Sequence, residues 1–361
     1  MNVTDVSVMA LWTAATLYAI AMVAYSVRLA RVAESKLNAK NAALVPVAVG
    51  AARAVPLAVG VVGTVPVAVG AAGAFGSEAD AADAAPATAP ARAPGARAKG
   101  IGRSTMFVGF VLHLVGVVTR GIDAGHAPWS SMYEFTITGS MVAVAVFLIV
   151  QRKRDITYIA PAVAGFAAFA VVTGLRVWYR NAVGLQPALD SYWLVIHVPI
   201  AIMASGIFGV SGAASVLQVM RIDRERELKK RRRFFGWLNV PHRVVKSRAA
   251  RALEVVPTPQ VLESLTFRLN AVGFVLWTFT VMSGAMWAEH AWGRFWGWDP
   301  KEVWSFVIWI IYAAYLHSRT TQGWAGRRAA LLAISGFIAI VLNFTVVNLY
   351  VQGLHSYSGL K

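Results

Sequence analysis

Long apolar segments recur along the chain, separated by shorter polar stretches. Because apolar and polar residues do not alternate within these segments, the pattern favours helices over a transmembrane β-barrel. Each segment has roughly the length, about 20 residues, with which an α-helix crosses a membrane, although the seventh is short. The predicted fold is an all-α, polytopic membrane helix bundle with about eight transmembrane helices: Val8–Val27, Ile101–Thr119, Ser131–Val150, Ile156–Leu175, Tyr192–Val219, Leu269–Ala288, Val303–His317 and Ala329–Tyr350.

Composition and charge agree with this class. The chain is 57% hydrophobic and 14% charged, which is typical of a membrane protein. With the amino terminus outside, 28 of the 34 Lys and Arg residues lie in the inward segments 28–103, 151–155, 220–268 and 318–328. This positive-inside bias predicts a multi-pass protein of the plasma membrane with both termini outside. The net charge of +17 therefore records topology rather than nucleic-acid binding, and the run Lys229–Arg233 is expected to contact anionic lipid headgroups.

The segments between the spans suggest how the chain is organised. A ten-residue repeat begins at residues 45, 55 and 65, and its prolines at 56 and 66 argue against a ninth span. We expect a first transmembrane helix at 1–30, a low-complexity Ala/Val/Pro/Gly linker on the inner side at 31–100, transmembrane helices two to five at 101–219, a basic cytoplasmic loop at 220–268, and helices six to eight at 269–361 with an outer tryptophan-rich segment at 287–302.

Several kinds of chemistry are excluded or unsupported. The chain has no cysteine, so any thiol chemistry must use the thiols of a partner. No phosphate-binding loop or dinucleotide fingerprint occurs, and ATP-driven transport by this chain alone is therefore unsupported. Asp5 and the absence of a basic region before the first apolar segment favour an anchored first helix over a cleaved signal.

The most distinctive segment begins at Trp287 and reads WAEHAWGRFWGWDPKEVW. Within it, Trp292, Gly293, Trp296, Trp298 and Asp299 fall within eight positions. A membrane protein commonly places single aromatic residues at the lipid–water boundary, but this density exceeds such a belt. Several indole faces at one level would suit a flat, apolar ligand.

Two histidines share the predicted membrane side of this segment. His197 lies six residues into the fifth span, about 8 Å deep, and His355 follows the last span. Either residue alone is more simply explained as a hydrogen-bonded polar side chain. Together with the tryptophans they fit a bound haem b, because two neutral imidazoles can supply both axial ligands of its iron.

The other histidines are less informative. His317 closes the seventh span, about 20–30 Å from the tryptophans, and marks either a second inner site or simply a helix end, which its position alone favours. His113 is equally compatible with packing and with function. His126 lies in the outer segment GHAPWSSMYEF and could line the same cavity. His290 and His242 are expected to be solvated.

Four segments in this order resemble one family. WGRFWGWDPKEVW followed by YLHSR resembles the WWD motif of the haem-handling proteins, specifically the CcsA type of system II cytochrome c biogenesis (named CcsB in some bacteria). SYWLVIHV, NLYVQGLHSY and GHAPWSSMYEF resemble that family's two outer histidine segments and its GHxPxSNxYE stretch. The resemblance covers roughly residues 104–361 without the basic loop, whereas the 31–100 insert departs from the family pattern.

The resemblance implies a subunit of a holocytochrome c synthase, or haem lyase. Such a protein presents haem at the outer membrane face and supports its thioether attachment to the CxxCH segment of apocytochrome c, in complex with a ResB-like membrane protein. It implies that His197 and His355 are catalytic axial ligands. It also favours a second haem site at His317 over a simple helix end. The expected binding residues are Trp292, Gly293, Trp296, Trp298 and Asp299. Arg294 or Lys301 would pair with the haem propionates. A haem exporter without ligase activity and a membrane scaffold are the alternatives.

Overall fold

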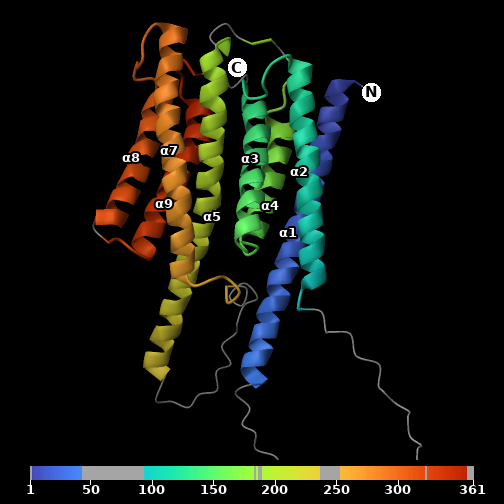
Figure 1. The fold of residues 1–361 in the computed structure, drawn as a ribbon, viewed down its shortest axis with the longest axis vertical. Coiled ribbons are helices and arrows are strands. Elements are labelled where there is room, and N and C mark those ends of the chain that lie inside the picture. The colour runs from blue at the N-terminus through green and yellow to red at the C-terminus, as the bar shows by residue number, and fades with distance from the viewer. Residues whose placement is uncertain are drawn as a thin grey trace, which may run out of the picture. The chain divides into compact units, whose positions relative to one another are not determined.

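The computed structural model describes residues 2–42, 93–182, 184–185, 189–235, 253–321 and 323–355, without the side chains of 40–42 and 228–235. Most of the repeat-containing linker, the run Lys229–Arg233 and His242 lie outside the described side chains. The described residues form helices and no β-strand, as predicted: α1 Val3–Ala42, α2 Ala96–Ala124, α3 Met132–Lys153, α4 Ala160–Val177, α5 Tyr192–Phe235, α7 Pro259–Trp292, α8 Pro300–Thr321, α9 Arg327–Leu342, the π-helix η2 Asn343–Val347 and α10 Asn348–Tyr350 (Figure 1).

Seven of the described helices are long and apolar enough to cross a membrane. The exception among the eight predicted spans is α8, which forms a helix of 22 residues but does not meet that hydropathy criterion. Its sequence is rich in Trp and Tyr, which count as only weakly hydrophobic although their rings are largely apolar. The protein is thus a multi-pass helical membrane bundle, and α8 packs within it against α7 and α9.

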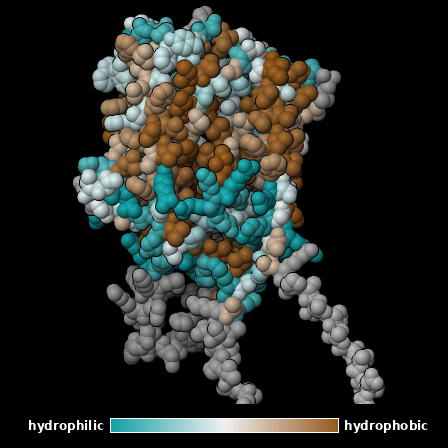
Figure 2. All heavy atoms as spheres, viewed as in Figure 1, coloured by the Kyte–Doolittle hydropathy of each residue, from teal (hydrophilic) through white to brown (hydrophobic). Residues whose placement is uncertain are grey.

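The chain divides into two compact units, and the larger one contains residues 1–34 and 94–361. Within this unit we call the end that carries Trp292–Pro300 the tryptophan end. The opposite end, which we call the basic end, carries ion pairs from Lys99 and Arg28 to Asp155 and from Arg319 to Glu263. Hydrophobic side chains cover the middle of the face in Figure 2, and hydrophilic ones gather toward both ends. This distribution is expected of a bundle whose middle lies in lipid.

Small residues allow α1 and α2 to pack closely. Glycines at 102, 109 and 116 lie seven residues apart on one side of α2. A Cβ atom built at these positions would come within 3.1 Å of Tyr25, 3.0 Å of Tyr18 and 2.6 Å of Leu11, respectively. Each glycine therefore accepts one large side chain of the antiparallel helix α1, an arrangement that membrane helices commonly use.

The remaining helices of the larger unit are joined through α5. This helix packs against α3 on one side and against α7 and α9 on others. Phe208 of α5 stacks on Tyr312 of α8, with ring centroids 3.7 Å apart, and both side chains are fully buried. Beyond the apolar span, α5 continues as a helix through its basic residues to Phe235.

Candidate ligand-binding site

A cavity of about 540 Å³ connects the tryptophan end with the interior of the bundle. It is lined by residues of α3, α4, α5, α7, α9 and η2 and by the first residues of α8. His197 and His355 both line it, together with Trp287 and Trp296. The two histidines that the sequence analysis paired therefore border one space, although α5 and the segment after α10 are far apart in the chain.

His197 is held in one tautomer by a backbone carbonyl. Its Nδ1 atom lies 2.9 Å from the carbonyl oxygen of Thr280 on α7. Because a carbonyl oxygen can only accept, Nδ1 carries the proton and Nε2 keeps the lone pair. A Cβ atom at position 284 would lie 2.8 Å from Cε1 of His197, so Gly284 allows α7 to approach the imidazole ring. The contact fixes Nε2 as the nitrogen that can bind a metal.

His355 is oriented by a buried carboxylate. Its Nδ1 atom lies 3.2 Å from Oδ2 of Asp299, and the backbone N–H of Leu354 donates to Oδ1 at 3.1 Å. A Cβ atom at position 353 would lie only 2.5 Å from Oδ1 of Asp299, so Gly353 lets the chain pass beside the carboxylate. With Nδ1–H donated to Asp299, Nε2 becomes the basic nitrogen of His355.

The electrostatics of Asp299 follow from these contacts. Burial raises the pKa of its carboxyl group, but the hydrogen bond and charge of His355 and the backbone N–H groups of Leu354 and Lys301 outweigh burial. The net effect places the pKa of Asp299 below its ordinary value. The carboxylate is therefore ionised at neutral pH and able to hold the imidazole of His355.

Trp287 and Trp292 connect the two histidines. Trp287 is stacked almost parallel to His197, with an interplanar angle of 11° and a centroid distance of 6.3 Å. Its ring also makes a T-shaped contact with His355, with ring centroids 5.4 Å apart. Trp292 makes a T-shaped contact with His355 as well, with ring centroids 4.9 Å apart. Trp287 was not among the predicted binding residues, although it opens the tryptophan-rich segment. The available signal was its place in the same tryptophan-rich segment, five residues before Trp292.

Gly293, Trp296 and Trp298 of the motif lie at a helix end, on the cavity wall and at the surface, respectively. Gly293 ends α7 in the left-handed conformation, with φ of 70°, and its N–H donates to the carbonyl of Glu289 at 2.7 Å. Trp296 lines the cavity, whereas Trp298 is 77% exposed and is not among the lining residues. The φ of Trp298 is 59°, a conformation that large side chains rarely adopt.

A carboxylate organises the turn before α8. Oε2 of Glu302 accepts the backbone N–H groups of Gly297 at 2.8 Å and Asp299 at 3.1 Å. The carbonyl oxygen of Asp299 in turn accepts the N–H of Val303. These bonds begin α8 and present the side chain of Asp299 to His355, so one short turn determines both features.

Of the two predicted propionate-binding residues, Lys301 lines the cavity and Arg294 does not. The Nζ atom of Lys301 donates to the carbonyl of Asn343 at 3.1 Å and to Oδ1 of Asn348 at 2.8 Å. The guanidinium of Arg294 instead lies over Gly297, in the space that a Cβ atom there would occupy. Lys301 therefore supplies a positive charge at the cavity wall and connects α8 to the π-helix.

Lys301 should make stability depend on pH. It precedes the predicted seventh span, and burial lowers its pKa from 10.5 to about 8, against the opposing effect of Asp299. Between these values the unfolded chain binds a proton that the folded protein has released, so stability rises with pH. We expect detergent-solubilised protein to gain on the order of 2 kcal/mol between pH 7.5 and 10 through this group.

Thermal unfolding at both pH values, compared between the unmodified protein and a Lys301→Met variant, would measure this contribution. The variant should show a smaller rise in Tm with pH. Equal rises in the two proteins would contradict the assignment.

The remaining histidines are not among the residues that line the cavity. His317 is exposed near the basic end of α8. His113 is fully buried beside the hydroxyl of Tyr18, at 3.2 Å. His126 contacts the carbonyl of Ala127 through Nδ1 at 3.0 Å, and His290 is paired with Glu289 at 3.1 Å.

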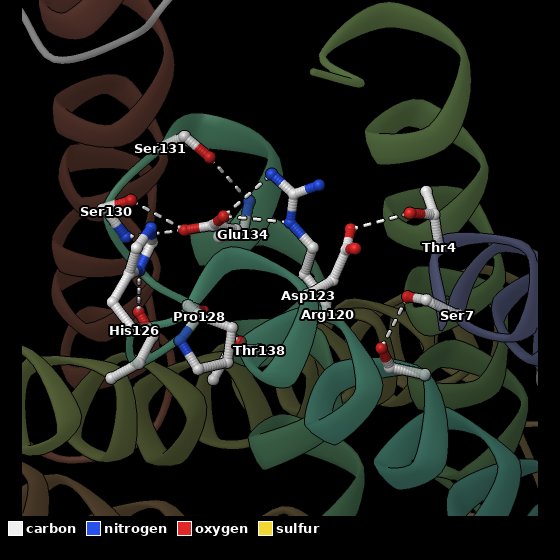
Figure 3. A network of polar contacts seen from close by, with 12 residues as sticks. Thr4, Ser7, Arg120, Asp123, His126, Pro128, Ser130, Ser131, Glu134 and Thr138 are labelled. Atoms are coloured by element: carbon white, nitrogen blue, oxygen red, sulfur yellow. Dashed lines mark hydrogen bonds and ion pairs between the residues drawn. The ribbon is translucent and has the colours of Figure 1, made fainter. Parts of the chain in front are cut away.

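Glu134, in the segment GHAPWSSMYEF, forms a buried ion pair with Arg120 of α2 (Figure 3). Nε of Arg120 and Oε1 of Glu134 are 3.0 Å apart, and both side chains are at most 3% exposed. Oε2 of Glu134 accepts the N–H and the hydroxyl of Ser130, and Ser131 caps α3 by accepting the N–H of Glu134 at 3.2 Å. Ser130 and Ser131 line the cavity, so the ion pair supports part of its wall.

Comparison with known proteins identifies related chains. A profile of the family described as cytochrome C assembly protein matches residues 104–355. The protein is 36% identical over 269 residues to the cytochrome c biogenesis protein CcsA of Synechococcus sp. strain CC9902, which covers 72% of this chain and 86% of the relative. It is also 36% identical over 256 residues to CcsA of Prochlorococcus marinus strain NATL2A, with 67% and 79% covered.

Proposed function

Because the chain belongs to the cytochrome c assembly protein family, as a CcsA-type cytochrome c biogenesis protein, we propose that the cavity at its tryptophan end binds haem as a substrate. The protein presents this haem for covalent attachment to apocytochrome c. His197 and His355 are the axial ligands of the iron. The proposal extends the role in cytochrome c biogenesis to a specific site, ligand and reaction.

The observation that carries the proposal is the matched environment of the two imidazoles. Each donates Nδ1–H to an acceptor fixed by another element, the Thr280 carbonyl or the Asp299 carboxylate. Metal-binding histidines typically show this second hydrogen bond, which orients the ring and makes Nε2 more basic. Both side chains line one cavity, and its volume falls within the range of about 300–1,000 Å³ that is usual for small-molecule sites.

The aromatic and charged groups around the pair suit the rest of the macrocycle. Trp287 lines the cavity and stacks on His197, whereas Trp292 is not among the lining residues and contacts the ring of His355. Lys301 is the positive side chain among the described lining residues, and we assign it to a haem propionate. Gly293 ends α7 and Asp299 precedes α8, so the two shape the segment from either end, and Trp296 lines the cavity.

The reaction mainly requires that the vinyl groups of haem and the thiols of apocytochrome c be held in the right orientation. Each cysteine of a CxxCH segment adds its S–H across one vinyl double bond, so that sulfur bonds to one vinyl carbon and hydrogen to the other. No atom is lost and no oxidant is consumed. The histidine of the segment replaces one axial ligand, which releases the product. The protein contributes by holding the vinyl groups near the thiols, which raises their effective concentration.

The arrangement of charge supports a site that faces outward, and the absence of cysteine supports a reaction that needs a partner. Basic residues gather at the end opposite to the histidines, as expected if the tryptophan end faces away from the cytoplasm. The chain carries no cysteine, so both thiols come from apocytochrome c. A ResB-like membrane protein completes the synthase.

The spectrum of an Asp299→Asn variant tests the site. Asparagine keeps an oxygen acceptor for the N–H of Leu354 but removes the charge that holds His355. We expect haem affinity to fall by roughly 10–100-fold, which is typical when a residue supporting a metal ligand is replaced. Titration of the purified complex with haem, followed at the Soret band, measures this change.

A Glu289→Gln variant is the matched control, because Glu289 also lies at the tryptophan end, in the last turn of α7, and pairs with the exposed His290. It should bind haem normally. If the unmodified complex shows no Soret absorbance even with added haem, the proposed function fails, and unaltered binding by Asp299→Asn would remove the role assigned to that residue.

A further inference from the structure

The two histidines that border the cavity are carried by very different parts of the backbone. His197 lies in the second turn of α5, a helix of 44 residues, so its backbone moves only together with that helix. His355 lies beyond α10, which ends at Tyr350. Residues 351–355, the last that the structure describes, form bends and turns, and 351–354 are exposed. The backbone that carries His355 is therefore much less enclosed than the backbone that carries His197.

Contacts from α7 enclose the imidazole ring of His197. Its Nδ1 atom lies 2.9 Å from the carbonyl oxygen of Thr280. A Cβ atom at position 284 would lie 2.8 Å from Cε1 and 3.1 Å from Nδ1 of His197, so the ring rests against the backbone of α7 at Gly284. Trp287 stacks almost parallel to the ring, at an interplanar angle of 11°. The ring therefore has little room to turn away from the cavity while α5 and α7 remain packed.

A single carboxylate holds both the side chain and the backbone of the segment around His355. Oδ2 of Asp299 lies 3.2 Å from Nδ1 of His355, and Oδ1 accepts the N–H of Leu354 at 3.1 Å. Trp287 and Trp292 contact the imidazole ring in T-shaped geometry, and the side chain of His355 is still 20% exposed. A shift of the Asp299 carboxylate would therefore break two bonds to this segment at once.

The two histidines also differ in their access from the tryptophan end. Asp299 follows Trp298, whose side chain is 77% exposed, and residues 351–354 are exposed as well. His197 lies about 8 Å along α5 from the start of that helix. A peptide that reaches the cavity at the tryptophan end thus meets the segment of His355 at the surface, whereas His197 lies within the bundle.

We propose that His355 is the axial ligand that the histidine of the CxxCH segment replaces, and that His197 stays bound to the iron during this exchange. The inference rests on the proposed function, which requires that one axial ligand be exchanged. The bond between iron and Nε2 of His355 breaks, and a bond between iron and the incoming imidazole nitrogen forms. Both imidazoles are neutral, so no proton or electron is transferred. Asp299 is a positioning residue, because its bonds hold His355 against displacement.

A peptide that cannot form thioether bonds tests which histidine is replaced. In an SxxSH peptide, serines stand in place of both cysteines and the histidine is retained. A His355→Ala complex loaded with reduced haem is five-coordinate through His197, and the peptide should convert it to the low-spin spectrum of two imidazole ligands. A His197→Ala complex is five-coordinate through His355. It should stay five-coordinate with the peptide, because the peptide competes with His355 for the same side of the iron.

The affinity for the same peptide tests the role of Asp299 without removing a ligand. At saturating haem, an Asp299→Asn complex should bind the SxxSH peptide severalfold more tightly than the unmodified complex, because His355 is held less firmly. A Glu289→Gln complex is the control and should bind the peptide as the unmodified complex does. An SxxSA peptide, in which alanine stands in place of the histidine, should change the spectrum of none of these complexes.

A two-imidazole spectrum of His197→Ala with the peptide would overturn the proposal, since the peptide would then occupy the side of His197. An unchanged five-coordinate spectrum of His355→Ala would also overturn it. A five-coordinate spectrum before the peptide is added shows that each variant still folds and binds haem. Equal peptide affinity of Asp299→Asn and the unmodified complex would remove the role assigned to Asp299 in the exchange. If the unmodified complex takes up no haem, the failure belongs to the proposed function.

Discussion

Replacing both His197 and His355 by alanine is expected to abolish the six-coordinate haem spectrum and the maturation of cytochrome c. Each imidazole lines the cavity and has its Nδ1 bound, by Thr280 or by Asp299, so Nε2 is the nitrogen left to ligate. Loss of a supporting residue alone weakens metal binding about 10–100-fold, so removing both ligands should weaken it by more. Haem titration of the purified complex and cytochrome c assays in cells measure the two effects.

Two controls make this result specific. His290→Ala removes an exposed histidine at the same end of α7 and should change neither the spectrum nor maturation. Added imidazole should partly restore the spectrum of each single variant, because it can occupy the space that the side chain leaves. A double variant with an unchanged axial spectrum would show that the iron is bound elsewhere.

Among the substitutions considered for stability, removing Glu134 should lower the free energy of unfolding most. A Glu134→Leu variant leaves the guanidinium of Arg120 buried without its carboxylate, and such an uncompensated charge costs about 3–5 kcal/mol. The variant also loses the bonds from Ser130 that hold the cavity wall. Thermal unfolding of the detergent-solubilised protein should show a markedly lower Tm.

A double variant distinguishes the cost of the lone charge from the loss of packing. Arg120→Met together with Glu134→Leu removes both charges and should recover much of the lost stability, because apolar replacement of a whole buried pair is often tolerated. Ser131→Ala removes only the cap of α3 and should cost about 1 kcal/mol. Equal destabilisation by the single Glu134 variant and the double variant would contradict this account.

Continuous apolar runs predicted the helices well because the lipid environment imposes the same length and polarity on each of them. The helix ends were less predictable. α1 continues from the predicted end at Val27 to Ala42, and α8 begins at Pro300 instead of Val303. Polar residues can continue a helix once it leaves the apolar layer, so hydropathy defines the span but not the helix.

That His197 and His355 border one cavity was predictable because topology alone places both at one depth. The residues that hold the two imidazoles in place were not predictable. Thr280 contributes a backbone carbonyl, which every residue has, and Gly284 matters only because α7 passes close to an imidazole. The exposure of Trp298 likewise depends on the turn formed with Glu302. These features arise from contacts between distant segments, which no local pattern encodes.

The π-helix at Asn343–Val347 determines in which direction the residues beyond it face. Its wider turn accommodates one more residue than an α-helix would, and the Asn343 carbonyl within it accepts the ammonium of Lys301. If Asn343–Val347 formed an α-helix instead, the residue that the wider turn absorbs would rotate everything beyond it by about 100°. The imidazole of His355 would then face away from its counterpart, even though every side chain of the motif was still present.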